Sequence, residues 1–256
     1  MNEPRSLAQR MYPLRVLLLV LYFAITIVLV ALALILSWPL PYRFRFALAR
    51  TWSRGMLWVG RLTCGLDWVI EGRENLPPDP SVLYIKHSSV FEAYGHIGIF
   101  PQQTWVVKKE LLWTPMVGWG MAALKCIAIN RGAGSQAVKQ VIQQGKERLA
   151  EGIWVTIFPE GTRMEPRESR RYGVSGAALA RDAGCLIVPV AHNARDFFPR
   201  NGLPERPGCI RICIGPPVDP SAQDPKETNL IAQAWIESKM AEISDGYKID
   251  NSTTSA

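Results

Sequence analysis

The sequence has few of the residues that build metal sites and disulfide frameworks. Only three histidines and five cysteines occur among its 256 residues, the cysteine count is odd, and no CxxC pair is present. Cys209 and Cys213 lie in an apolar run that predicts a strand, and no metal motif accompanies His96 or His192. We therefore expect neither a metal site nor a disulfide-stapled fold. Unpaired, reduced thiols are typical of a domain that faces the cytoplasm.

Two catalytic signatures are also absent from the sequence. The stretch "GAGSQ" at 132–136 lacks the Lys-Ser/Thr pair of a nucleotide-binding P-loop, so its glycines predict a turn. No G-x-S-x-G elbow surrounds Ser88 or Ser89, which makes a serine lipase the weaker interpretation. Capping of the following helix explains these two serines better.

Positive charge is in excess. The formal net charge is +7, which favours anionic partners such as nucleic acid, an acidic membrane surface or a phosphorylated substrate. No nucleic-acid-binding module accompanies this charge, so we expect no nucleic-acid partner.

An uncharged apolar run covers residues 16–38. Its 23 residues exceed the roughly 20 that cross the hydrocarbon core of a bilayer. Only Thr26 and Ser37 are polar, whereas a core helix of a soluble protein would show a polar face. The run is also longer than the apolar region of a signal peptide. It predicts a permanent hydrophobic anchor helix.

The next segment, residues 41–64, alternates arginine with Phe, Trp, Leu and Met, as amphipathic helices in the lipid headgroup region do. Because arginines flank residues 16–38 on both sides, the positive-inside rule leaves two arrangements open: a single membrane helix or a two-helix membrane motif held in one leaflet. A helix packed on the soluble domain is the alternative for residues 41–64. We assign residues 1–66 to the membrane anchor.

From residue 67 the chain alternates strands and helices. Apolar runs predict seven strands, at residues 67–72, 81–87, 103–111, 125–132, 153–158, 185–194 and 208–218. Helical spacing predicts three helices, at residues 135–152 with Ser135 as N-cap, 173–184 and 229–244. This order predicts an α/β domain over residues 67–244, with a mixed, largely parallel sheet flanked by helices. Residues 245–256 have nothing to bury and are expected to be disordered.

Polar residues gather just beyond the predicted strand ends, where the sites of such sheets lie. His87 ends the second strand, and Glu92 follows five residues later. A neutral imidazole can accept a proton from a hydroxyl when a carboxylate orients its other nitrogen. Glu92, one turn into the next helix, can fold back beneath the ring. For an isolated His-x4-Glu pattern, however, a capping or surface histidine is the commoner explanation.

The stretch "PEGTR" at 159–163 follows the fifth predicted strand. The backbone amides of Gly161 and Thr162 can face an anion, and Arg163 offers a planar, bidentate donor suited to phosphate. Glu160 can hold Arg163 in place. Further basic residues near other strand ends are Lys108, Lys109 and Arg131.

Four stretches in series resemble the glycerolipid acyltransferase family: "KHSSVFE" at 86–92, "VVKKELLWTPMVGWGMAALKCIAINR" at 106–131, "IFPEGTR" at 157–163 and "VPVAHNA" at 188–194. The resemblance extends from residue 67 to about residue 218. It implies acyl transfer from a thioester of coenzyme A or acyl carrier protein to the sn-2 hydroxyl of 1-acyl-sn-glycerol-3-phosphate, which gives phosphatidic acid in phospholipid biosynthesis.

The resemblance also implies residue roles. His87 corresponds to the general base, and Glu92 stands where most members carry Asp, the residue that orients the histidine. Residues implied in binding the phosphate-bearing acceptor are Lys108, Lys109, Arg131, Glu160, Gly161, Thr162 and Arg163. Neither a cofactor nor a metal is expected, because the thioester is a co-substrate.

One departure from the family pattern concerns Gly173 and Ser175, which stand where relatives often carry Lys and Gly. The departure motivates an alternative acceptor, either another lysophospholipid or a lyso amino-acid lipid. A membrane-anchored binding protein with a dead site is a competing hypothesis, which the intact His87 and Glu92 argue against. The expected partners are a lysophospholipid, an acyl thioester and membrane lipids, with acyl carrier protein as a candidate donor. The expected location is a bacterial inner membrane, with the catalytic domain facing the cytoplasm.

Overall fold

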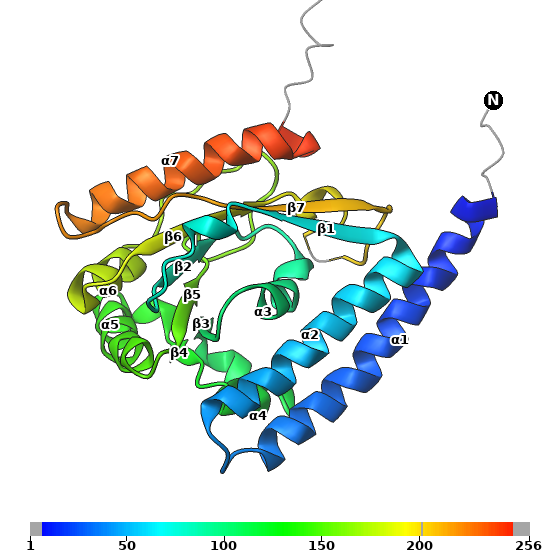
Figure 1. The fold of residues 1–256 in the computed structure, drawn as a ribbon, viewed down its shortest axis with the longest axis horizontal. Coiled ribbons are helices and arrows are strands. Elements are labelled where there is room, and N and C mark those ends of the chain that lie inside the picture. Colours follow the sequence, from blue (N-terminus) through cyan, green and yellow to red (C-terminus); the bar gives the residue numbers. More distant parts are fainter. Residues whose placement is uncertain (1–6, 201, 248–256) are drawn as a thin grey trace, which may run out of the picture.

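The computed structural model describes residues 7–200 and 202–247, whose strands form one mixed sheet (Figure 1). The strands of this part of the chain are β1 (Leu66–Glu71), β2 (Val82–Ile85), β3 (Gln103–Lys108), β4 (Ile127–Ile129), β5 (Trp154–Ile157), β6 (Ile187–His192) and β7 (Gly208–Ile214). Their order across the sheet is β1-β7-β6-β2-β5-β3-β4. Neighbouring strands run parallel, except that β6 and β7 are antiparallel. The predicted mixed, largely parallel sheet is confirmed.

Helices flank this sheet. They are α1 (Leu7–Leu36), α2 (Tyr42–Cys64), α3 (Gly95–Ile99), α4 (Val117–Ala123), α5 (Ser135–Ala150), α6 (Ser175–Ala183) and α7 (Pro225–Ile243). Short 3₁₀ turns connect them: η1 (Arg73–Asn75), η2 (Val90–Ala93), η3 (Lys109–Trp113), η4 (Arg131–Ala133), η5 (Ala194–Asp196) and η6 (Asp245–Tyr247). The three helices predicted in the α/β domain correspond to α5, α6 and α7.

The central strand β2 shows how the two faces are covered. Successive side chains of a strand point to opposite faces. Leu83 and Ile85 pack in one cluster with residues of α1 and α2, whereas Val82 and Tyr84 pack in another with residues of α5, α6 and α7. All four side chains are buried, which is why β2 is a continuous apolar run instead of an alternating one.

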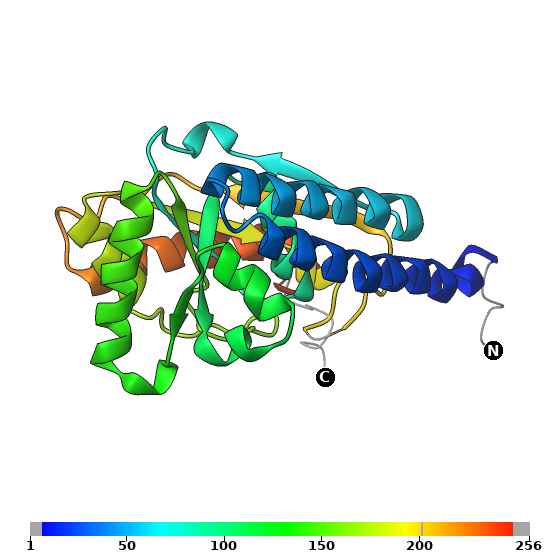
Figure 2. The ribbon, with the colours of Figure 1, turned by 90° about the horizontal axis from the view of Figure 1, so that it is seen from below.

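The first two helices form a hairpin and lie side by side (Figures 1 and 2). Among the described residues, one helical stretch is long and apolar enough to cross a membrane, Arg10–Leu36 within α1. Only 17% of the residues in its most apolar stretch are buried, whereas a core helix of a soluble protein is mostly buried. The apolar helix expected at residues 16–38 is present, and it extends further toward the N-terminus than the uncharged run.

The packing of the second helix agrees with the alternative of a helix packed on the domain, while its interfacial role stays a prediction. One face of α2 packs on the domain, where Arg45 Nη1 donates a hydrogen bond of 2.7 Å to the Ala123 carbonyl. The other face carries Trp58 and Leu62, which are 60% and 63% exposed. The helix therefore contacts the α/β domain and also presents an unpartnered apolar face.

Two local predictions need correction. Ser135 is the first residue of α5 and makes no capping hydrogen bond, because Gly134, at a φ of 52°, occupies the N-cap position. Residues 245–247 form η6 instead of belonging to a disordered tail. The Asp245 backbone N–H donates to Asp196 Oδ2 at 2.9 Å, and the Ser244 hydroxyl donates to Asp196 Oδ1 at 2.7 Å. Residues 248–256 lie outside the described part of the chain.

Close packing of α6 on β2 predicts the effect of one methyl group. A Cβ at Gly176 would lie 2.4 Å from the ring of Tyr84, whose hydroxyl donates to Asn229 and so holds the ring in place. We expect Gly176→Ala to lower the free energy of unfolding by about 1–3 kcal/mol. In Gly60→Ala, the new Cβ meets no atom within 4 Å apart from its chain neighbours and the adjoining backbone of α2. We expect this variant to gain about 0.5–1 kcal/mol in free energy of unfolding from helix propensity. Thermal unfolding of both variants in one detergent checks this, and equal shifts would contradict it.

Candidate active site

The histidine and glutamate predicted as a pair are in contact. His87 directly follows Lys86 at the end of β2, and its Nδ1 is hydrogen-bonded to Glu92 Oε2 in η2. The Glu92 side chain is 2% exposed, whereas that of His87 is 18% exposed. Because an ionised carboxylate only accepts hydrogen bonds, Nδ1 carries the proton and Nε2 is left as the basic nitrogen. This arrangement can accept a proton from a bound hydroxyl.

A capping box holds the glutamate. Glu92 Oε1 accepts hydrogen bonds from the backbone N–H groups of Ser88 and Ser89, each at 2.6 Å. The Ser89 hydroxyl in turn accepts from the Phe91 N–H at 3.0 Å. The local pattern Ser-x-x-Glu favours this reciprocal cap at the start of a helix. The predicted capping role of the serines is confirmed for Ser89.

A second histidine, which the sequence analysis left without a role, lies against the same carboxylate. His192 Nε2 is 2.9 Å from the Lys86 carbonyl oxygen and 3.3 Å from Glu92 Oε1. Both oxygens are acceptors, so Nε2 of His192 carries the proton, while its Nδ1 accepts from the Ala194 N–H at 3.4 Å. His192 therefore donates to the Lys86 carbonyl and places the same N–H 3.3 Å from Glu92 Oε1.

These contacts determine the charge of Glu92. Burial alone would raise the pKa of its carboxyl, but hydrogen bonds from His192 and His87 hold that pKa well below the usual range.

The position of His192 follows from strand pairing. β6 runs parallel to β2, with Val190 beside Ile85, so both strands end at the same edge of the sheet.

A buried ion cluster lies next to this pair. The Lys86 side chain is fully buried, and its Nζ lies 2.6 Å from Glu237 Oε1 of α7 and 3.3 Å from Glu160 Oε1. Although burial alone would lower the pKa of Lys86, the two carboxylates raise it above its ordinary value. The expectation that Glu160 holds Arg163 is corrected to this pairing, because a fully buried ammonium requires neighbouring negative charge.

Glu160 itself is strongly perturbed. It is 3% exposed, and burial raises the pKa of its carboxyl to about 7 against the opposing charge of Lys86. Neither Lys86 nor Glu237 was singled out from the sequence, because the three residues are far apart in the chain and no short motif joins them.

The PEGTR loop lies beside His87. The Met164 N–H donates to the His87 carbonyl at 2.8 Å, which ties the loop to the end of β2. Gly161 has a φ of 73°, a conformation that favours glycine. Its N–H donates to the Phe158 carbonyl at 3.0 Å within the turn, so the expectation that this amide faces an anion is not met. Arg163 Nη1 donates to the Arg200 carbonyl at 3.1 Å.

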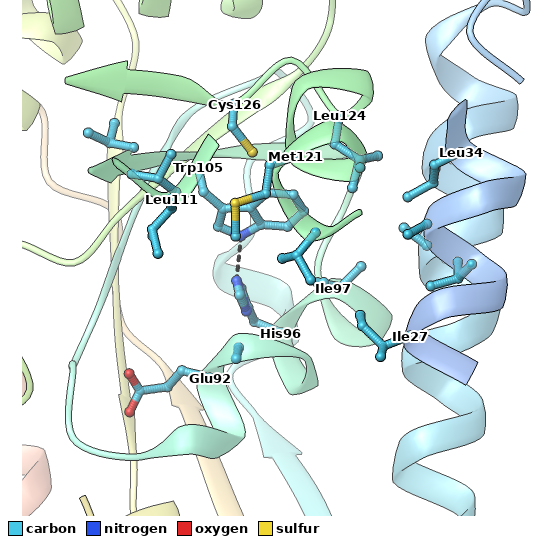
Figure 3. Close-up of a pocket in the computed structure, with 18 of the residues that line it drawn as sticks. Ile27, Leu34, Glu92, His96, Ile97, Trp105, Leu111, Met121, Leu124 and Cys126 are labelled. Atoms are coloured by element: carbon cyan, nitrogen blue, oxygen red, sulfur yellow. Dashed lines mark hydrogen bonds between the residues drawn. The ribbon is translucent and has the colours of Figure 1, made fainter. Parts of the chain in front are cut away.

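A cavity of about 290 Å³ opens beside these residues (Figure 3). Its polar lining includes His87, Glu92, Lys108 and Arg163. Its apolar walls come from α1, α2, α3, β3 and α4, and include Ile27, Leu34, Trp52, Ile97, Trp105, Met121 and Leu124. The cavity therefore joins a basic nitrogen and two cationic side chains to a space suited to a hydrocarbon chain.

His96 lies in the wall of this cavity. Trp105 Nε1 donates a hydrogen bond to His96 Nε2, and Glu92 lies on the other side of His96 from Trp105 (Figure 3). Burial lowers the pKa of His96 to about 3, so this ring is neutral. It therefore adds no charge to the apolar part of the cavity.

The remaining predicted residues are distributed as follows. Lys109 is exposed at the start of η3 and does not line the cavity. Arg131 opens η4, but its side chain lies outside the described part of the structure. Among the described residues, no group of three His, Cys, Asp or Glu side chains could hold a metal ion.

Comparisons with known proteins agree with this geometry. An acyltransferase family model matches residues 67–193. The chain is 40% identical over 200 residues to a 1-acyl-sn-glycerol-3-phosphate acyltransferase of Pseudomonas aeruginosa, an alignment that covers 77% of this chain and 78% of the relative. The chain belongs to the acyltransferase family. The activity class expected from the resemblance is thereby confirmed.

The acyltransferase also resembles more distant relatives. It is 30% identical over 168 residues to a yeast (Saccharomyces cerevisiae) 1-acyl-sn-glycerol-3-phosphate acyltransferase, of which the alignment covers 54%. A crystal structure of the 1-acyl-sn-glycerophosphate acyltransferase PlsC from Thermotoga maritima superposes with a TM-score of 0.72 and 22% identity, over 90% of this chain and 98% of that one. That likeness confirms the fold.

The contact of His192 with Glu92 predicts a positioning role. Its Nε2 lies 3.3 Å from the carboxylate that orients His87, so its removal leaves Glu92 less firmly held. We expect His192→Phe to lower kcat several-fold. His192→Gln retains an N–H donor near the position of Nε2 and is expected to stay close to the wild type. Equal kcat values for all three proteins would contradict this role.

The buried cluster predicts a pH-dependent loss of stability. Lys86→Met leaves the Glu160 carboxyl without its counter-charge, and breaking a buried pair costs about 3–5 kcal/mol. The pKa of Glu160 is raised to about 7 in the folded state, so the protonated carboxyl is the form that the folded state favours. The free energy of unfolding therefore falls as pH rises through about 7. The variant is therefore expected to lose more stability at about pH 8 than at about pH 5.

An exposed ion pair supplies the control for that measurement. Lys146 and Asp182 lie 2.8 Å apart with side chains 48% and 54% exposed. Lys146→Met is expected to change the free energy of unfolding by less than about 1 kcal/mol at either pH. Denaturant unfolding of both variants at the two pH values distinguishes the cases, and a pH-independent loss in Lys86→Met would contradict the prediction.

Proposed function

We propose that this acyltransferase transfers an acyl group from a thioester of coenzyme A or acyl carrier protein to the sn-2 hydroxyl of 1-acyl-sn-glycerol-3-phosphate, giving phosphatidic acid. One observation carries the proposal. His87, oriented by the buried Glu92, lines a largely apolar cavity together with the cationic Arg163 and Lys108. The name of the Pseudomonas relative supports the same acceptor.

In the proposed mechanism, Nε2 of His87 is the general base. It takes the proton of the acceptor hydroxyl while that oxygen attacks the thioester carbonyl carbon, so that a C–O bond forms. The tetrahedral intermediate then expels the thiolate, the C–S bond breaks, and the proton passes from His87 to the leaving sulfur. Glu92 keeps Nδ1–H in place and stabilises the imidazolium. The substrate oxygen is the nucleophile, which agrees with the involvement of Ser88 and Ser89 in holding Glu92.

Phosphate recognition is assigned to the basic residues near the cavity. Arg163 can bind a phosphate through two parallel N–H donors, and Lys108 adds a point charge. The PEGTR loop, with Glu160, Gly161 and Thr162, sets the position of Arg163. Lys109 and Arg131, which the resemblance implies in acceptor binding, are retained in the proposal as further basic residues, although Lys109 does not line the cavity.

The apolar cavity is assigned to an acyl chain. Burying a methylene group contributes about 0.8 kcal/mol, so a long chain gains substantial binding energy from these walls. Ile27 and Leu34 of α1 belong to the cavity wall, so the helix proposed as a membrane anchor also contributes to binding.

Membrane association is supported by α1 and by the relatives. We assign residues 1–66 to the anchor and place the protein at a bacterial inner membrane with the α/β domain on the cytoplasmic side. The free cysteines and the need for a cytoplasmic thioester support this side. No cofactor is required by this chemistry, since the thioester itself is activated toward attack.

A second acceptor is favoured by one observation. The Gly173 N–H donates to the Pro159 carbonyl at 3.0 Å, so the stretch that departs from the family pattern packs directly on the PEGTR loop. A change there can alter the headgroup that the loop accepts. Another lysophospholipid or a lyso amino-acid lipid is therefore the alternative acceptor.

Acyl transfer by the detergent-solubilised protein tests the proposal. Palmitoyl and oleoyl thioesters of coenzyme A and of acyl carrier protein are offered with lysophosphatidic acid beside a panel of other lyso-lipids. We expect phosphatidic acid from the wild type and a loss of about 10²–10⁴-fold in His87→Ala, the usual contribution of a general base.

Each other outcome identifies a different error. Unchanged transfer by His87→Ala would remove the mechanism, and preference for a phosphate-free acceptor would replace the substrate. A covalent acyl-enzyme would favour a serine nucleophile. Inactivity with every thioester would favour a binding protein with a dead site.

A further inference from the structure

A second group of exposed apolar side chains lies outside the hairpin of α1 and α2. Leu111, Trp113 and Trp119 are 43%, 83% and 54% exposed, and we call them the tryptophan tip. Leu111 and Trp113 belong to η3, and Trp119 belongs to α4. Exposed tryptophans on neighbouring elements are unusual on a surface that faces only water.

The tip has a fixed backbone. Met116 has a φ of 65°, and the Val117 N–H donates to the Pro115 carbonyl at 2.7 Å, which forms a strained γ-turn between η3 and α4. A Cβ at Gly118 would lie 2.2 Å from the Leu112 carbonyl oxygen, so only glycine allows this close approach. The tip therefore keeps its exposed side chains in place by main-chain contacts.

The tip adjoins the apolar helix. α4 packs against the C-terminal half of α1, where a Cβ at Gly120 would lie 3.5 Å from Leu34 Cδ1 and 3.9 Å from Ala31 Cα. Leu111 of the tip and Leu34 of α1 line the same cavity from opposite sides (Figure 3). The tip therefore borders the cavity and is joined to α1 through α4.

The charges around the tip suit an anionic lipid surface. Lys108 and Lys109 are exposed directly before it, and Glu110 beside them leaves an excess of one positive charge. Tryptophan prefers the level of the lipid headgroups, where its ring is apolar and its N–H stays hydrated. Lysines next to such a ring attract anionic headgroups.

We propose that the tryptophan tip docks into the headgroup region of a phospholipid bilayer on the side occupied by α1, as a second membrane contact of this chain. The lip of the cavity then lies at headgroup level. An acyl chain can pass from the leaflet into the cavity without crossing water. This consequence rests on the proposed acyl transfer, whereas the docking itself rests only on the membrane position proposed for α1.

Site-directed labelling tests the docking directly. In a background with the exposed Cys209 replaced by Ser, Trp113→Cys carries an environment-sensitive fluorophore, and Leu230→Cys on α7 is the control at a similarly exposed apolar position. The protein is reconstituted into vesicles of equal parts phosphatidylethanolamine and phosphatidylglycerol. We expect a blue shift at position 113 and quenching by headgroup-labelled lipid, with neither at position 230.

Two results would overturn the docking. Equal accessibility of both labels to a water-soluble quencher would place the tip in water. A blue shift at position 113 that depends on protein concentration and not on lipid would assign the tip to contacts between copies of the chain.

A kinetic arm tests the consequence. Trp113→Ser/Trp119→Ser is expected to lose activity several-fold on long-chain lysophosphatidic acid in vesicles and to match the wild type on a short-chain, water-soluble analogue. Leu203→Ser/Leu230→Ser is the matched control and is expected to be unchanged on both. Equal loss on both substrates, or on neither, would overturn the entry role. A wild type without acyltransferase activity would overturn the proposed function and leave the labelling result standing.

Discussion

A buried carboxylate, that of Glu92, joins the parts of this molecule that must act together. An ionised carboxylate is costly to bury unless several donors compensate for its lost hydration. Here the donors are His87 and the backbone amides of Ser88 and Ser89, and the N–H of His192 lies 3.3 Å away. These groups lie in the segment that follows β2 and at the end of β6. The geometry of the proposed base therefore follows from the need to satisfy one buried charge.

The parallel pairing of β2 and β6 makes that arrangement possible. Parallel strands bring their carboxyl ends to one edge, so residues far apart in sequence meet there without a local motif. Lys86 connects this edge of the sheet to two further segments. Its carbonyl accepts a hydrogen bond from His192, and its ammonium group pairs with carboxylates of the PEGTR loop and of α7.

Sequence patterns predicted the features that depend on residues close together in the chain. Each of the seven strands is a local apolar run, and the contact of His87 with Glu92 is a short-range pair on a capped turn. The features that were missed depend on long-range packing. His192 meets Glu92 only through the order of strands, and Lys86 meets Glu237 only through the position of α7. Ser135 was mistaken for a cap because Gly134, which precedes it, supplies the positive φ that the turn requires.

The N-terminal hairpin differs from a simple tether in its packing. Val16 and Leu19 of α1 are buried in the same cluster as Leu83 and Ile85 of β2, although most of α1 is exposed. The boundary at residues 66 and 67 thus divides the chain by sequence character, while the core extends across it. Since α1 also supplies part of the cavity wall, a shift of this helix would change the space beside His87. The membrane position proposed for α1 and the proposed substrate binding therefore depend on contacts of the same helix.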